Sequence, residues 1–363
     1  MPDIRIQKLR KEFKELVAVR DVTITFPTSS VTCLLGPSGC GKTTLMRMIA
    51  GLEKPTSGEV YFDDRRMTGL EPETRNIGMV FQYPVVYRGL DVYRNIDLPL
   101  KEAGLPVEER RKRIEEVSEI LDLKDNLRQN IAQLDNSTRQ KVAVARAVAR
   151  RPRIILFDEP LTNVDVETKV QLKQALRQLT RQLKQTIVYV THDQTEAMTL
   201  ADQIALMNEG EIVQQDQPRK LYNQPNDVFG GWFLGNPGMN FIHVDVKRSN
   251  GSVELHSPLF PGAVRVSGTD HQERLILGIR PEHVAVGSSR SARAVPAEVA
   301  SSSVQVGGQY LLMLRIGDLT VKAKTRPETG RGLGKQVHVE LPTEHLMVFT
   351  EDGKRARAEL KLG

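Results

Sequence analysis

A glycine-rich loop is the part of this sequence whose residue types and spacing point most directly to chemistry. A glycine, four further residues and then Gly-Lys-Thr occur in the loop formed by Gly36, Pro37, Ser38, Gly39, Cys40, Gly41, Lys42, Thr43 and Thr44. Glycines let successive backbone N–H groups converge on phosphate oxygens, and a helix that starts there adds the positive end of its dipole. Lys42 is then expected to bind the β- and γ-phosphates of ATP, and Thr43 to hold Mg²⁺. A glycine-rich turn with a chance lysine would leave the apolar strand before the loop and the helical pattern after it unexplained.

Three more polar residues stand where apolar runs end. Asp158 and Glu159 follow residues 154–157, and His192 lies just beyond residues 187–190. Parallel strands expose their carboxyl ends at one edge of a sheet, so these side chains are expected beside the loop. Asp158 would then reach Mg²⁺, Glu159 would polarise the attacking water, and His192 would sense the γ-phosphate. The acids could instead cap the next helix, and a histidine at a strand end can be purely structural.

The elements that must position these residues alternate along the first part of the chain. Residues 31–35 form a short apolar run before the loop, and residues 45–49 show helical spacing after it. Residues 107–123 and 170–183 carry apolar side chains on one helical face. This alternation predicts an α/β fold, with a parallel sheet covered by helices.

The last third of the chain has a different pattern. Glycines and a proline punctuate residues 229–238, so we place a domain boundary there, with a first domain at 1–235 and a second at 236–363. Short alternating apolar runs separated by Gly, Ser and Pro follow, at residues 264–266, 311–314 and 337–339. They predict a small β-barrel or sandwich.

Composition and charge narrow the setting of the protein. Of its 363 residues, 39% are hydrophobic and 26% are charged, which is typical of a folded globular protein rather than a disordered one. No apolar run approaches the roughly 20 residues of a spanning helix, and the first residues lack the order of a secretory signal. Although the net charge is +6, basic residues are mostly interspersed with acidic ones, as in residues 108–113, so we expect no nucleic-acid partner. With only Cys33 and Cys40, a reduced cytoplasmic setting is expected.

In their order, these motifs resemble the ATP-binding cassette (ABC) family, and more closely its sugar-importer ATPases of the maltose-transporter type. The resemblance covers the whole first domain and implies a phosphate-loop NTPase cassette with a helical subdomain at about residues 86–150. The second domain resembles the small all-β regulatory barrel, an OB/TOBE-like fold, that follows the cassette in those importers. Residues 278–283 are the most specific part of that second resemblance.

The resemblance also implies roles for further residues. Gln82 looks like the Q-loop glutamine, which in this family contacts the metal and the water and faces the transmembrane partner. Asp165 belongs to a segment that resembles the nucleotide-proximal D-loop, and His192 resembles the switch histidine. Phe13 stands where the family places an aromatic ring on adenine, although a core or surface phenylalanine suits the position nearly as well.

The family signature, usually Leu-Ser-Gly-Gly-Gln ahead of a helix, is altered in this chain. The aligned residues are Leu134, Asp135, Asn136, Ser137 and Thr138. In the family, the serine hydroxyl and glycine N–H groups of one cassette meet the γ-phosphate bound by a second cassette. Here Asp135 places an anion at the serine position, and two side chains replace glycines that allow close approach. These residues still suit a helix cap, but we expect the phosphate role to be impaired.

The residues and the resemblance together predict the ATP-hydrolysing motor subunit of an ABC importer. A homodimer would carry the altered signature in both of its composite sites, so we expect a heterodimer with a second, related ATPase subunit. Transmembrane permease subunits and a periplasmic or extracellular solute-binding protein complete the implied complex, with this chain peripheral on the cytoplasmic face of the inner membrane. The expected solute is a sugar or a polyol such as glycerol.

Two other classes of protein stay open at this point. One is a regulatory subunit that holds nucleotide with little hydrolysis. The other is a non-transport ABC protein that acts on ribosomes or DNA, which normally has two cassettes in one chain or a long coiled-coil insert. Neither of those two features occurs in the sequence.

Overall fold

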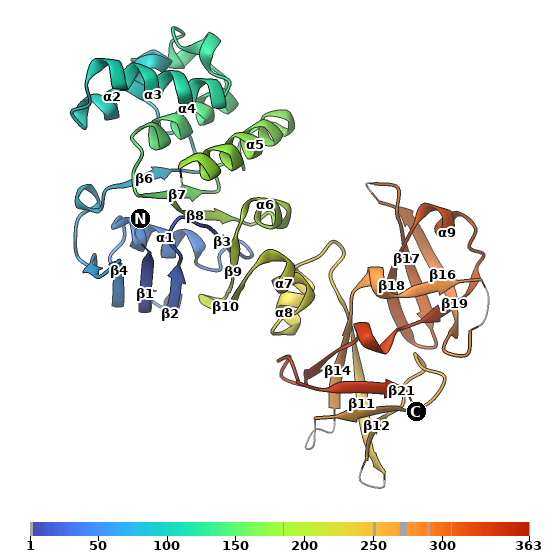
Figure 1. Ribbon diagram of the computed structural model, residues 1–363. Helices are drawn as coiled ribbons and strands as arrows, with labels where there is room; N and C mark the ends of the chain where they lie inside the picture. The colour runs from blue at the N-terminus through green and yellow to red at the C-terminus, as the bar shows by residue number, and fades with distance from the viewer. Residues whose placement is uncertain are drawn as a thin grey trace. The chain divides into compact units, whose positions relative to one another are not determined.

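The computed structural model describes residues 3–183, 185–249, 252–268, 274–288, 291–305 and 307–362 (Figure 1). The chain divides into two compact units, Met1–Leu221 and Tyr222–Gly363. The first unit is α/β and the second is built mainly from strands, as the sequence pattern predicts. Among the described residues, no helix combines the length and the apolar character needed to cross a bilayer.

The central sheet of the first unit has the strand order β10-β9-β3-β8-β7-β6. The strands are β3 (Val31–Leu35), β6 (Ile77–Val80), β7 (Ile154–Asp158), β8 (Thr186–Thr191), β9 (Gln203–Asn208) and β10 (Glu211–Asp216). All neighbouring pairs are parallel except β9 with β10. Every residue of β3, β7 and β8 is buried, because helices and the second sheet leave neither face of these strands open. The carboxyl ends of the parallel strands therefore share one edge.

A second, antiparallel sheet has the order β2-β1-β4-β5 and packs over the first helix of the unit. Its strands are β1 (Ile4–Phe13), β2 (Leu16–Phe26), β4 (Ser57–Phe62) and β5 (Arg65–Arg66), and the helix is α1 (Lys42–Ala50). One hydrophobic cluster joins Ile4 of β1, Leu34 of β3 and Leu45 of α1. The start of α1 is thereby held between two sheets, and the glycine-rich loop before it is held with it.

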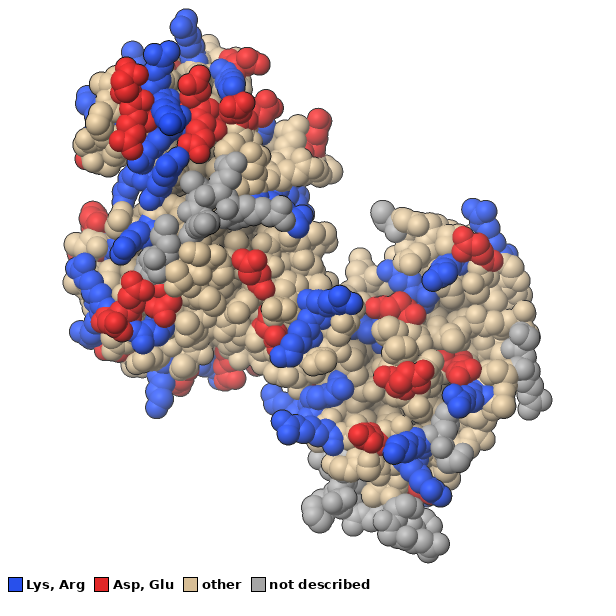
Figure 2. Space-filling view, in the orientation of Figure 1, with Lys and Arg blue, Asp and Glu red and all other residues tan. Residues whose placement is uncertain are grey.

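A layer of three helices lies beside strand β6 in the first unit (Figure 1). It consists of α2 (Val92–Glu102), α3 (Val107–Ile120) and α4 (Asn136–Ala149), each in contact with the other two. Figure 2 shows Lys and Arg interleaved with Asp and Glu over this layer, and two of the pairs are Arg110 with Asp97 and Arg113 with Glu109. The alternating charges of the sequence therefore lie on an exposed helical surface.

Longer and shorter helices complete the first unit. They are α5 (Val166–Leu183), α6 (Gln194–Leu200) and the 3₁₀ turns Pro72–Arg75, Lys124–Asn126 and Ile131–Gln133, while α7 (Pro218–Asn223) spans the division between the units. Helix α5 begins earlier than the residues 170–183 indicated by apolar periodicity. The reason is a cap, because the carboxylate of Asp165 accepts the N–H of Thr168 at 2.9 Å.

The second unit contains two antiparallel sheets, with orders β20-β14-β11-β12-β13-β21 and β15-β19-β16-β17-β18. Their strands are β11 (Asn240–Ser249), β12 (Ser252–Leu255), β13 (Val264–Ser267), β14 (Arg274–Ile279), β15 (Ala285–Gly287), β16 (Val295–Val304), β17 (Tyr310–Ile316), β18 (Leu319–Thr325), β19 (Gln336–Glu340), β20 (Met347–Thr350) and β21 (Glu359–Leu362). Short helical segments are α8 (Val228–Phe233), α9 (Pro327–Arg331) and the 3₁₀ turns Pro281–His283 and Thr343–His345. Ile242 and Val264 of the first sheet share one hydrophobic cluster with Leu314 and Val339 of the second.

The compact second unit begins before the boundary placed at 235/236 from the sequence. Residues 222–235 belong to it because Arg280, which is only 1% exposed, binds their backbone carbonyl groups. Its guanidinium group donates to the carbonyl oxygens of Gly231 at 2.8 Å and of Tyr222 at 2.7 Å, and also to that of Leu234. The glycine-rich stretch that resembles a linker in the sequence is in part a helix, α8, held by this side chain.

Candidate active site

The glycine-rich loop between β3 and α1 needs its glycines for two different reasons. Gly39 and Gly41 have φ angles of 82° and 103°, which side-chain-bearing residues rarely adopt. A Cβ atom on Gly36 would lie 2.2 Å from the carbonyl oxygen of Met207, and one on Gly41 would lie 2.3 Å from that of Ala18. The loop therefore keeps a tight backbone turn just ahead of the N-terminus of α1, as an anion-binding loop requires.

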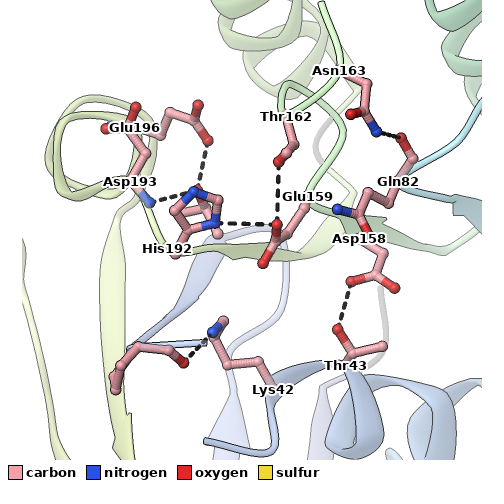
Figure 3. A network of polar contacts seen from close by, with 12 residues as sticks. Lys42, Thr43, Gln82, Asp158, Glu159, Thr162, Asn163, His192, Asp193 and Glu196 are labelled. Atoms are coloured by element: carbon pink, nitrogen blue, oxygen red, sulfur yellow. Dashed lines mark hydrogen bonds and ion pairs between the residues drawn. The ribbon is translucent and has the colours of Figure 1, made fainter. Parts of the chain in front are cut away.

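Lys42 places a buried ammonium group inside this turn. Lys42 is only 4% exposed, and its Nζ donates to the carbonyl oxygens of Gly36 at 2.9 Å and Pro37 at 2.8 Å (Figure 3). Within the described residues, no carboxylate forms an ion pair with it. The Nζ group also lies 3.8 Å from Sγ of Cys40. A buried cation with these contacts is suited to an anionic ligand, because a phosphate would supply the missing charge.

Thr43 and Asp158 bring two hard oxygen ligands together next to Lys42. The hydroxyl of Thr43 donates to Oδ1 of Asp158 at 3.0 Å. Asp158 ends β7 and is 5% exposed, and this burial raises the pKa of its carboxyl group although Thr43 and Arg47 act in the opposite direction. Hydroxyl and carboxylate oxygens are ligands that Mg²⁺ prefers, so the pair fits that ion.

Glu159 and His192 form the second part of the site. Oε2 of Glu159 accepts the hydroxyl of Thr162 at 3.1 Å and lies 3.1 Å from Nδ1 of His192 (Figure 3). Glu159 has a φ angle of 45°, an uncommon value for glutamate, and its N–H donates to the carbonyl oxygen of Val190 at 3.0 Å. The strained turn thus directs the carboxylate toward the histidine, whose side chain is 48% exposed and accessible to a ligand.

Gln82 follows β6 at the same edge of the sheet. Strands β6 and β7 pair in parallel, with Val80 opposite Phe157, so Gln82 and Asp158 leave neighbouring strands side by side (Figure 3). The carbonyl oxygen of Gln82 accepts the side-chain amide of Asn163 at 3.1 Å. This bond connects the segment after β6 with the segment that holds Asp165.

Phe13 is the last residue of β1, in the antiparallel sheet. Its ring is 42% exposed, and Nζ of Lys11 lies 4.7 Å from the ring centroid. The ring has an open face that a flat ligand could cover, but its own contacts are those of a surface residue.

The altered signature makes contacts within the chain. Asp135 caps α4, because its Oδ1 accepts the N–H of Thr138 at 2.6 Å, and Asn136 is the first residue of that helix. Ser137 donates its hydroxyl to Oδ2 of Asp165 at 2.6 Å. This bond and the one from the backbone of Thr168 hold the pKa of Asp165 well below its usual range. Leu134 is buried just before the helix.

Several contacts of this network were not predicted from the sequence, although Thr162 and Asn163 lie in the segment 161–165 that resembles the D-loop. Thr162 donates to Glu159, and Asn163 donates to the backbone of Gln82. Lys169 forms ion pairs with Asp193 and Glu196 beside the histidine. Thr162 and Asn163 could have been suspected, because they directly follow the acidic pair in a turn. Lys169 and Glu196 have no local signal, since each is one charged residue among others on a helix.

The fold and the site together define a phosphate-loop nucleotide-binding protein. Family models agree with this class. The model described as "ABC transporter" matches residues 19–162, "MalK OB fold domain" matches residues 235–284, and "TOBE domain" matches residues 277–349.

Whole-chain relatives extend the match. The sn-glycerol-3-phosphate import ATP-binding protein UgpC 2 of Agrobacterium fabrum is 38% identical over 99% of this chain and 96% of its own length. The trehalose/maltose import ATP-binding protein MalK of Thermococcus litoralis is 36% identical over 98% and 100%. A bacterial ABC transporter cassette solved as a dimer is 31% identical, with a TM-score of 0.55, over 60% of this chain and 99% of that one. The chain therefore belongs to the ABC transporter family, in the group of importer ATPases that carry OB-fold and TOBE domains after the cassette.

Proposed function

We propose that this chain is the motor subunit of an ABC importer and hydrolyses ATP at the site formed by Lys42, Asp158, Glu159 and His192. The observation that carries the proposal is the contact between Glu159 and His192 next to the phosphate loop. A nucleotide-binding module without turnover would need the loop, but it would need neither a strained glutamate nor a histidine on its carboxylate.

The phosphate chain of ATP would lie in the loop 36–44, with backbone N–H groups and Lys42 around the β- and γ-phosphates. Thr43, Asp158 and Gln82 are the residues that would hold Mg²⁺, which supplies positive charge for the transferred phosphoryl group. Phe13 would cover the adenine ring, and Asp165 would border the nucleotide from the D-loop side.

Glu159 would orient and polarise the attacking water, and His192 would contact the γ-phosphate and the same water. Thr162 and His192 both engage Oε2 of Glu159, which fixes the direction of its carboxylate. No covalent intermediate is needed, because phosphoryl transfer depends on positioning and on charge neutralisation.

The altered signature would serve a partner's nucleotide poorly. Asp135 sets a negative charge at the N-terminus of α4, where the family binds a γ-phosphate, and it already takes up the N–H of Thr138. Two like charges about 4 Å apart repel by about 4 kcal/mol at an effective dielectric constant near 20. The hydroxyl of Ser137 is engaged with Asp165 of the same chain. A phosphate would therefore meet a carboxylate where the family offers a hydroxyl and free amides.

For this reason, the functional dimer would be a heterodimer. A second, related ATPase subunit would supply an unaltered signature to the site formed by Lys42, Asp158 and Glu159 of this chain. The altered signature of this chain would in turn complete the nucleotide site of that second subunit. Two copies of this chain would form two sites that both contain the altered signature. The intact Lys42, Asp158, Glu159 and His192 would then have no site in which to hydrolyse ATP efficiently.

The remaining parts of the proposal concern the assembly. The domains 1–235 and 236–363 would act as motor and regulatory barrel, with the helical subdomain at about residues 86–150. Permease subunits would dock near residues 82–93, placing the chain peripherally on the cytoplasmic face of the membrane, and a solute-binding protein would deliver the cargo. The names of the relatives, which concern glycerol phosphate and disaccharides, support a sugar or a polyol such as glycerol.

The deciding experiment isolates the complex through an affinity tag on this chain and measures its composition and its transport-coupled ATP hydrolysis. The expected result is a complex with permease subunits and a second cassette protein, active only when both cassettes are present. Full coupled activity with this chain as the only cassette would refute the heterodimer. No hydrolysis in any assembly would refute the motor function.

A further inference from the structure

Lys169 lies one turn after the D-loop and connects it to the segment that carries His192. Its backbone N–H donates to the carbonyl oxygen of Asp165 at 2.8 Å, within the first turn of α5. Its Nζ lies 2.8 Å from Oδ2 of Asp193 and 2.9 Å from Oε1 of Glu196, both on the start of α6. One side chain thus bridges two helices that begin at the nucleotide site.

The acceptors of this bridge fix the residues on both sides of His192. Glu196 is only 3% exposed, and its Oε2 accepts the hydroxyls of Thr191 at 2.7 Å and Tyr189 at 3.1 Å. The N–H of Asp193 donates to Oγ1 of Thr191 at 3.0 Å. Both neighbours of His192 are therefore tied to the Lys169 network.

The charges favour a single arrangement of this network. Burial disfavours the charge on Lys169, but its bonds to Asp193 and Glu196 outweigh this and raise its pKa overall. Burial likewise disfavours the charge on Asp193, and the bond from Lys169 makes the largest opposing contribution, so its pKa is lowered overall. Lys173 adds a smaller favourable effect on Asp193. A carboxylate as buried as Glu196 needs a cation, and Lys169 provides it.

We propose that Lys169 is a positioning residue for hydrolysis, which holds the Thr191–Asp193 segment so that the imidazole of His192 stays beside Glu159. It touches neither the nucleotide loop nor Glu159, and it acts through the backbone of the histidine. The inference rests on the roles given to Glu159 and His192 under the proposed function. Without the bridge, α6 and the D-loop would move independently, and the histidine would lose its fixed distance to the glutamate.

The test compares Lys169→Met and Lys169→Arg in the isolated transporter complex, with kcat and KM for ATP measured from pH 6 to pH 9. Lys169→Met is expected to lower kcat about 10-fold or more while KM for ATP changes less than about 2-fold, because a small displacement of a catalytic group costs rate rather than binding. Lys169→Arg keeps both ion pairs and should restore most of kcat.

The matched control is Lys220→Met, which removes another lysine–aspartate pair of the same unit, to Asp216 at 2.8 Å, outside the site. It should leave kcat and KM unchanged. If Lys169→Met does not fold, Lys169→Gln, which keeps a hydrogen-bond donor, takes its place under the same criteria. A kcat equal to wild type, or a loss of kcat that Lys169→Arg does not restore, would overturn the inference.

The two proposals fail in distinguishable ways. If the Glu159→Gln variant still hydrolyses ATP, then Glu159 does not have the proposed chemical role, and the proposed function is refuted. Hydrolysis that is lost in Glu159→Gln but unchanged in Lys169→Met removes only the positioning role of Lys169.

Discussion

Nδ1 of His192 lies 3.1 Å from Oε2 of Glu159, although the two residues follow different strands of the central sheet. Strands β7 and β8 run parallel with Asp158 opposite Val190, so both polar residues emerge at the same level of the sheet edge. The pairing is thus set by strand register, which is fixed by buried apolar residues. The register brings the two segments to one sheet edge, and contacts beyond the strand ends then set the distance between the two side chains.

The Glu159→Gln variant is expected to bind ATP and to lose turnover. Glutamine keeps the size of the side chain and one acceptor oxygen, but it lacks the charge that polarises water, so kcat should fall at least about 100-fold. Phosphate release and nucleotide retained on the isolated complex are the measurements. Glu211→Gln, an exposed acid on β10, serves as the control and should behave as wild type. Near-normal phosphate release by Glu159→Gln would contradict the assignment.

Asp158 links the site to pH-dependent stability. Its folded-state pKa is raised above the ordinary value of 3.8 by burial, so the folded chain holds more protons than the unfolded chain just above that pH. The contribution of Asp158 to the stability of the nucleotide-free protein is therefore lost as the pH rises through the pKa of the folded state. The burial that raises this pKa makes the ionised form of the carboxyl group unfavourable in the nucleotide-free fold.

Asp158→Asn should therefore raise the thermal midpoint of the nucleotide-free chain at pH 7, since the amide can still accept the hydroxyl of Thr43. Saturating Mg²⁺ and ATP should raise the wild-type midpoint by about 5–10 °C, and this rise should vanish in the variant. Asp64→Asn, at an exposed acid paired with Arg5, is the control. A normal Mg²⁺-dependent shift in Asp158→Asn would exclude this residue as a ligand.

The proximity of the loop, the acids and the histidine could be predicted, because the chemistry expected of them requires short, fixed spacings. The phosphate loop is contiguous, and the acids and the histidine stand directly at strand ends. The bridge from Lys169 to Glu196 could not be predicted, since it depends on how α5 packs beside α6 and both residues look like ordinary helix charges. The same applies to Ser137 and Asp165, which lie far apart in sequence.

The boundary between the units shows a second limit of sequence reasoning. Glycines in residues 229–238 indicate a domain boundary in the sequence, whereas Gly231 is needed for packing, because a Cβ atom there would lie 2.8 Å from the ring of Phe241. A glycine required for close contact and a glycine required for flexibility have the same sequence pattern. The β-strands of the second unit were easier to predict because alternation is a local property.

Arg280→Met is expected to lower the free energy of unfolding of the second unit by about 2–4 kcal/mol, because buried carbonyl groups lose their donor. Lysine should not restore stability, since it lacks the planar fork that binds several carbonyl oxygens at once. Trp232 is the single tryptophan of the chain and lies in this unit, so urea unfolding followed by its fluorescence measures the change. Arg274→Met, at an exposed arginine, should change stability by less than about 0.5 kcal/mol. Equal midpoints for Arg280→Met and wild type would contradict the role of this arginine.

The altered signature yields the prediction that bears most directly on the assembly. Asp135→Ser keeps a capping side chain on α4, so stability should change little, but it removes the charge that a phosphate would meet. In a heterodimer, this change combined with Asn136→Gly and Ser137→Gly should raise ATP hydrolysis by the isolated complex up to about 2-fold, because a second site gains donors for the γ-phosphate. The control is Asp227→Ser, which alters the cap of α8 in the other unit and should leave the rate per folded complex unchanged. An unchanged or lower rate in the signature variants would mean that the natural residues of this segment do not limit the second site.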